Sequence, residues 1–244
     1  MIAAFDPSLT HFGYVLLDET RVGKESSPQE RGLNGIGKEA FLNSGTFVTE
    51  KSDGLLVQRL ILQRERVRKL LLDNNIKFIA MEAPYWGDWN TEILFALNQY
   101  IHELFLNMDM FIFYVQPSSL KKFACPELCA KKEKIDKRHI VHQAKTELEK
   151  HGRRFSEHVS DAYFAGKMGC IFHQWYIQKT ITDEELPEYL RELFAGKHTF
   201  VKGARKGLTE YTGIIYREND QFFDYSKQSR KTDTIIKEVQ NGHQ

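Results

Sequence analysis

Four side chains that can bind a metal ion stand where apolar segments end or on an apolar helix stripe: Asp6, Glu82, His158 and Asp161. Taken singly, each of them could be a solvated strand end or a helix cap. Carboxylates that a fold brings close together raise one another's pKa, however, and a divalent cation removes that conflict. The set therefore predicts a Mg²⁺ site, in which a pair of ions can flank a phosphodiester, one activating water and the other stabilising the leaving oxygen.

The elements that must position these side chains begin with strands. Residues 2–5 and 12–17 are predicted as the two strands of a hairpin joined by "DPSLTH", and "SGTFVTE" as a third strand. The polar stretch 19–43 predicts a long loop or an inserted flap. Apolar residues at helical spacing in 55–75 predict an amphipathic helix, and the apolar run "IKFIAME" predicts a strand buried on both faces.

The next elements continue this alternation. The sequence predicts a helix in "NTEILFALNQYIHELFLNMD", a buried strand in "MFIFYVQP", and helices in "KRHIVHQAKTELEKHG" and "SEHVSDAYFAGKMGCIFHQWYI". Small residues in the last helix, at Ala162, Ala165, Gly166 and Gly169, would let it approach a sheet closely. This order of elements predicts an α/β fold, a mixed sheet flanked by helices.

The composition suits one generous domain with appendages, or two small domains, in a chain of 244 residues of which 41% are hydrophobic. No apolar stretch approaches the roughly 20 residues that cross a bilayer. The N-terminus lacks the pattern of a signal peptide, so we expect a soluble, cytoplasmic protein with no membrane partner. Cys125 and Cys129 have a spacing found in zinc sites, with His139 and His142 as nearby candidate ligands, and ordinary thiols are the alternative.

Basic residues gather in one stretch of a chain whose formal net charge is only +1. Residues 117–154 hold eleven Lys or Arg against five Glu or Asp, a local net charge of +6. Such a patch can neutralise several phosphates of a nucleic acid, and the alternative is a solvated basic helix face. The candidate DNA-binding residues of this stretch are Lys121, Lys122, Lys131, Lys132, Lys134, Lys137 and Arg138.

Three large aromatic residues, Tyr85, Trp86 and Trp89, follow Glu82 directly in the loop "APYWGDWN". Rings in such a loop can stack on unpaired bases of a nucleic acid. The alternative is a local or intermolecular packing cluster. The helix that follows this loop has an apolar face broad enough to form a dimer interface.

Four blocks of the sequence resemble the RuvC-type Holliday junction resolvases of the ribonuclease H-like superfamily. They are "FDPSLTHFGYVLLD", "IAMEAPYW", "VQPSSLKKFA" and "SEHVSDAYFAGKMG", and the resemblance covers about residues 1–178. It implies a nuclease domain with a mixed five-stranded sheet flanked by helices. It also implies a homodimer that binds four-way DNA junctions and nicks two strands, using two Mg²⁺ ions for which Mn²⁺ can substitute.

The resemblance also implies roles for particular residues. Asp6, Glu82 and Asp161 match the carboxylate ligands of the family, and His158 stands where some members have Asp and others His. Lys121 matches a basic residue near the scissile phosphate, Lys137 matches another basic residue, and Tyr85 takes the place of an aromatic that probes the junction centre.

The sequence departs from the bacterial enzymes of this family in three places. Ser8 replaces a glycine, the segment 19–43 is longer, and the C-terminal extension 179–244 has no counterpart. In the extension, Thr182 and Glu185 form the pattern of a helix capping box. The larger size resembles the phage or viral branch of the family, whose members act in the host cytoplasm. Some members of this branch cleave assorted branched DNAs. Whether this protein acts only on four-way junctions therefore stays open.

Two other classes of function stay open. An actin-like or sugar-kinase-type ATPase also begins with a strand that ends in Asp and continues into a hairpin, but it needs two duplicated domains and glycine-rich adenosine contacts. A branched-DNA-binding protein without catalysis is the second alternative, and the intact carboxylate set argues against it.

Overall fold

The computed structural model describes residues 1–21, 40–82, 91–148, 155–186, 190–191, 194, 198–199, 209–210, 213–218 and 221–224. Within these residues, no helix has the length and hydropathy that a membrane span requires.

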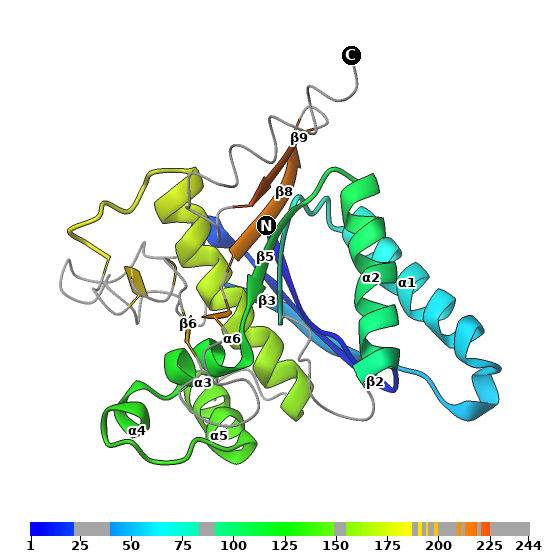
Figure 1. Ribbon diagram of the computed structural model, residues 1–244, viewed down its shortest axis with the longest axis horizontal. Helices are drawn as coiled ribbons and strands as arrows, with labels where there is room; N and C mark the ends of the chain where they lie inside the picture. The colour runs from blue at the N-terminus through cyan, green and yellow to red at the C-terminus, as the bar shows by residue number, and fades with distance from the viewer. Residues whose placement is uncertain are drawn as a thin grey trace.

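The centre of the fold is a mixed sheet with the strand order β3-β2-β1-β4-β5-β8-β9 (Figure 1). Its strands are β1 Ile2–Asp6, β2 His11–Leu17, β3 Phe41–Val48, β4 Phe78–Glu82, β5 Phe111–Val115, β8 Gly213–Glu218 and β9 Gln221–Asp224. The pairs β1–β2 and β2–β3 are antiparallel, whereas β1, β4 and β5 run parallel to one another. The predicted mixed sheet of five strands is confirmed in β1 to β5.

The C-terminal extension continues this sheet and its core. Strand β8 pairs antiparallel with β5, and β9 pairs with β8. The short strands β6 His198–Thr199 and β7 Thr209–Glu210 form a separate pair. Before them, the backbone amide of Thr182 donates to Glu185 and that of Glu185 donates to the Thr182 hydroxyl, which confirms the predicted capping box.

Helices cover both faces of the sheet. Helices α1 Leu56–Asp73 and α2 Thr91–Asn107 lie on one face, and α6 Glu157–Phe172 lies on the other, with α3 Pro117–Ala124, α4 Pro126–Ala130 and α5 Lys137–Leu148 on the same side (Figure 1). Alternate residues of each inner strand enter opposite cores: Ala4 packs in the α6 core, and Phe5 packs in the α1 and α2 core. This double burial explains why the inner strands read as continuous apolar runs.

Helix α6 lies very close to the sheet because its sheet-facing positions are small. A Cβ atom at Gly166 would come within 2.7 Å of Leu17 Cδ1, and one at Gly169 would come within 2.7 Å of Ala80 Cβ. The close approach predicted from the sequence is therefore confirmed. It places the first turns of α6 over the ends of β1 and β4.

A buried ion pair joins α6 to α5. The Lys167 ammonium, in a residue only 5% exposed, lies 2.6 Å from Glu147 Oε2, and the Tyr163 hydroxyl donates to the same oxygen over 2.9 Å. Removing one partner of such a pair would leave an uncompensated buried charge. The pair therefore fixes the position of α5 relative to α6.

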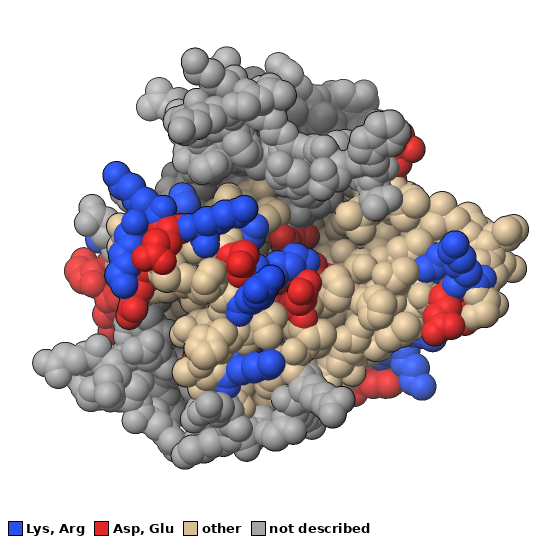
Figure 2. Space-filling model, turned by 90° about the horizontal axis from the view of Figure 1, so that it is seen from below, with Lys and Arg blue, Asp and Glu red and all other residues tan. Residues whose placement is uncertain are grey.

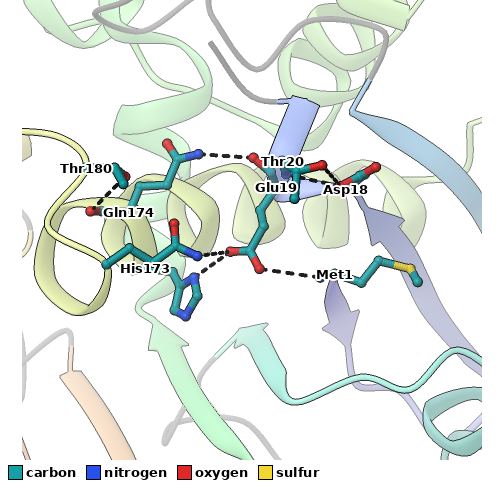
Figure 3. A network of polar contacts seen from close by, with 8 residues as sticks. Met1, Asp18, Glu19, Thr20, His173, Gln174 and Thr180 are labelled. Atoms are coloured by element: carbon teal, nitrogen blue, oxygen red, sulfur yellow. Dashed lines mark hydrogen bonds and ion pairs between the residues drawn. The ribbon is translucent and has the colours of Figure 1, made fainter. Parts of the chain in front are cut away.

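Of the segment 19–43 expected as a loop or flap, residues 22–39 lie outside the described residues. At its two ends, Glu19–Arg21 forms the 3-10 helix η1, and β3 already begins at Phe41. Figure 3 shows Glu19 as the centre of a polar network at the end of α6. Its carboxylate accepts from Gln178 and pairs with His173 and the N-terminal ammonium. Burial alone would raise the pKa of Glu19, but the hydrogen bond and charge of His173 outweigh it and hold that pKa below its usual value.

Two further short elements complete the described chain. The 3-10 helix η2, Lys51–Asp53, precedes α1, and the π-helical segment His173–Ile177 continues α6. Leu186, Leu190 and Phe194 of the extension are buried in the same core as α6.

Candidate metal centre

Three carboxylates meet where β1 and β4 end beneath the second turn of α6. Asp6 and Glu82 are the last residues of these two parallel neighbours, whose register pairs Phe5 with Met81. Helix α6 adds Asp161, so that one oxygen of each of the three carboxylates lies within 4.8 Å of the others. No other group of three potential His, Cys, Asp or Glu ligands comes this close in the described part of the chain.

Helix α6 can reach this position because β2 has a glycine beneath it. Gly13 pairs with Asp6 across the hairpin, and a Cβ atom there would lie 2.5 Å from both the carbonyl carbon and the carbonyl oxygen of His158. The start of the helix itself is fixed by Ser156, whose hydroxyl accepts from the amide of Val159 over 3.2 Å. Gly13 is thus the residue that admits the helix end to the site.

We expect Gly13→Ala to lower the free energy of unfolding by about 1–3 kcal/mol, because backbone atoms of α6 must shift to admit the methyl group. Urea denaturation measures this loss. Gly45→Ala is the matched control in β3, since the three atoms nearest to its added Cβ all belong to the side chain of Tyr14 and not to the backbone. An equal loss in both variants would contradict the role given to Gly13.

His158 lies against Asp6 and extends the carboxylate group. Its Nδ1 is 2.5 Å from Asp6 Oδ2, and this hydrogen bond raises the pKa of His158 against the opposing effect of burial. The ring of His11 stacks on that of His158, with centroids 6.0 Å apart and planes 4° from parallel. His11 was not predicted as a site residue, because nothing in the sequence of its strand indicates that it contacts His158.

The carboxylates repel one another in this buried setting. Burial, and then the charges of Asp6 and Asp161, raise the pKa of Glu82 well above its usual value. Burial and the charge of Asp6 likewise raise the pKa of Asp161 to about 7. A hard divalent cation prefers carboxylate oxygens and would offset this repulsion, so the residues present fit the predicted Mg²⁺ site.

The carboxylates open into a cavity of about 270 Å³. Lys121 of α3 and Lys137 of α5 line its wall, so two of the predicted basic residues stand beside the carboxylates. Burial lowers the pKa of Lys137, but the charges of Asp161, Asp6 and Glu157 outweigh it and raise that pKa, so this ammonium stays charged. The other described lining residues are Asp6, Pro7, Ser8, Glu82, Leu94, Asn98, Pro117, Leu120, Ile140, His158 and Asp161.

The remaining predicted DNA-binding residues divide into two groups. Lys122, Lys131, Lys132, Lys134 and Arg138 are exposed. In Figure 2, which views the molecule from below, basic side chains with acidic ones among them lie over α3, α4 and α5. The predicted base-stacking residues Tyr85, Trp86 and Trp89 lie outside the described residues.

Cys125 and Cys129 are free thiols, the first buried and the second half-buried. Burial raises the pKa of the Cys125 thiol. Within the described residues, no third ligand completes a metal group with them. The zinc alternative therefore has no support from the described residues.

No protein-family model and no curated protein sequence matches this sequence. Among solved structures, the chain is similar to RuvC of Thermus thermophilus, with a TM-score of 0.53 and 14% identity over 71% of this chain and 95% of that one. It is also similar to the T. thermophilus RuvC in complex with a Holliday junction substrate, with a TM-score of 0.51 and 15% identity over 72% of this chain and 95% of that one. The predicted ribonuclease H-like fold of the RuvC type is thereby confirmed.

Proposed function

We propose that this chain is a metal-dependent endonuclease that hydrolyses phosphodiesters in branched DNA, chiefly in four-way junctions. The observation that supports this function best is the group of three carboxylates within 4.8 Å, set in a cavity with two lysines on its wall. The carboxylates can hold cations, and the neighbouring ammonium groups can hold an anion. This combination suits a substrate that has a phosphate at its reacting centre.

Each residue of the cavity has a part in this proposal. Asp6, Glu82 and Asp161 would hold Mg²⁺, two ions in all, or Mn²⁺ in its place. Such ions supply an activated water and stabilise the leaving oxygen of a phosphodiester. Lys121 and Lys137 bind the phosphate that is cleaved and position it against the carboxylates. Against the effect of burial, the charges of Asp161 and Asp6 raise the pKa of Lys137, so its ammonium keeps its positive charge beside the three acids.

The surface around the cavity would supply affinity for DNA. The exposed basic residues of α3 to α5 contact phosphates, which makes binding steeply dependent on salt. Tyr85, Trp86 and Trp89 stack on bases at the branch point. Two copies of the chain, joined through α2, cut two strands in a paired reaction.

His158 acts in this proposal as a fourth protein ligand, since a ring 2.5 Å from Asp6 can reach a cation that Asp6 holds. We expect His158→Asp to retain Mg²⁺-dependent cleavage, because a carboxylate oxygen suits Mg²⁺ better than an imidazole nitrogen. We expect His158→Ala to lose roughly 10- to 100-fold in cleavage rate. Single-turnover junction cleavage measures both, and a folded but inactive His158→Asp protein would show that the histidine serves as a hydrogen-bond partner of Asp6 instead.

One set of reactions separates this function from its alternatives. The protein is incubated with an end-labelled four-way junction or a linear duplex, in Mg²⁺, Mn²⁺ or EDTA, and separately with ATP. We expect paired nicks in the junction with either metal, none in EDTA, and no hydrolysis of ATP. Hydrolysis of ATP without DNA cleavage would favour the actin-like alternative, and junction binding without cleavage in either metal would favour the non-catalytic one.

A further inference from the structure

A buried amide on α2 lines the carboxylate cavity and has one polar atom without a hydrogen-bond partner among the described residues. Asn98 is only 4% exposed and lines the cavity together with Asp6 and Glu82. Its Nδ2 donates to the carbonyl oxygen of Leu94 over 2.8 Å. Its Oδ1 has no hydrogen-bond partner among the described residues.

The orientation of this amide follows from its one hydrogen bond. Rotating the amide by half a turn would place Oδ1 against the carbonyl oxygen of Leu94, which offers no proton, so the amide nitrogen must face that carbonyl. The acceptor Oδ1 is therefore the atom left over. An acceptor buried without a partner is costly, and native proteins keep one chiefly where a water, an ion or a ligand completes it.

The surroundings of Asn98 do not otherwise call for an amide. Leu94 and Leu120 line the same cavity and would accommodate an apolar side chain at this position. The other unpartnered buried atoms of the described chain, on Gln63, Arg64 and His102, belong to residues that do not line the cavity. Asn98 is thus the described residue that combines an orphaned oxygen with the carboxylate cavity.

We infer that Asn98 Oδ1 is a further protein oxygen of the divalent cation site, binding the ion directly or through one water. This inference rests on the proposed function and adds a residue to its site. An amide oxygen is a hard ligand of the kind that Mg²⁺ and Mn²⁺ accept, and it is uncharged. It therefore adds coordination without adding a fourth negative charge to acids that already repel one another.

The test is Mn²⁺ binding, measured by isothermal titration calorimetry on the protein without DNA, beside thermal melting in EDTA. We expect Asn98→Leu to weaken Mn²⁺ binding by roughly 10-fold or more. In EDTA, the same variant should melt at or above the temperature of the wild type, because the orphaned oxygen has gone. Asn98→Asp keeps an oxygen at the site and should keep Mn²⁺ binding, while melting lower than the wild type in EDTA.

Asn74→Leu is the matched control. The Asn74 amide also donates to the carbonyl oxygen four residues before it, over 2.8 Å, but Asn74 does not line the cavity. This control should keep the Mn²⁺ affinity of the wild type. Asn98→Ala serves as a second variant should Asn98→Leu fail to fold.

The outcomes separate the inference from the function on which it rests. Wild-type affinity for Mn²⁺ in Asn98→Leu or Asn98→Ala would overturn the role of Asn98 and leave the carboxylate site standing. A wild-type protein that neither binds Mn²⁺ nor cleaves DNA would overturn the proposed function itself.

Discussion

Asp6→Asn, Glu82→Gln and Asp161→Asn should each abolish DNA cleavage while leaving junction binding intact or stronger. Each change replaces one of the three clustered carboxylates with an amide, which keeps one oxygen but loses the negative charge and the second oxygen that can hold a cation. Losing a cation ligand costs more than losing one oxyanion hydrogen bond, so we expect a decrease in rate on the order of 10³-fold or more. Binding should not suffer, because each change also removes a negative charge that faces the phosphates.

Single-turnover cleavage and gel-shift titration of the same labelled junction measure the two properties separately. Asp109→Asn is the matched control, since it makes the same chemical change at an exposed residue whose φ of 55° suits asparagine. Retained Mg²⁺-dependent nicking in one of the three variants would remove that residue from the site.

Without metal, Asp161→Asn should be more stable than the wild type. Burial and the charge of Asp6 raise the pKa of Asp161 to about 7, which means that the charged form is disfavoured in the folded protein. The neutral amide removes this repulsion. Each kcal/mol gained raises the melting temperature by about 2–4 °C in a chain of this size, so we expect a gain of several degrees in EDTA at pH 8.

The sign of the pH dependence follows from the same residue. Between its ordinary pKa of 3.8 and about 7, folded Asp161 holds a proton that the unfolded chain has released. The stability of the metal-free wild type should therefore decrease as the pH rises across this window, and the variant should lose less. Thermal melts in EDTA from pH 5 to pH 8 measure this loss of stability. Adding Mg²⁺ should restore the stability of the wild type but not raise that of the variant. A variant that melts below the wild type in EDTA would contradict the repulsion.

Much of the site could be predicted because strand ends are visible in the sequence. The apolar runs before Asp6 and Glu82 each end in a carboxylate, and parallel neighbours place their carboxyl ends at one edge of a sheet. The small residues of α6 likewise indicated a helix packed closely on that sheet, which brings Asp161 to the same edge. These features depend on local pattern and on general packing rules.

Other features depend on contacts between distant parts of the chain, which local pattern does not encode. The stack of His11 on His158 joins β2 to α6, and the orphaned oxygen of Asn98 belongs to α2, so both features depend on how the folded elements meet. Glu19 looked like part of a polar loop, but its carboxylate pairs with His173, 154 residues away in sequence. The pairing of β8 with β5 was also missed, because a short apolar stretch does not identify its partner strand.

The most direct test of the carboxylate centre is the anomalous difference map of a crystal soaked in Mn²⁺. We predict Mn²⁺ density in contact with Asp6, Glu82 and Asp161, and loss of this density in crystals of Glu82→Gln. A map with no density at these carboxylates, from a protein that still nicks four-way junctions in Mn²⁺, would contradict it.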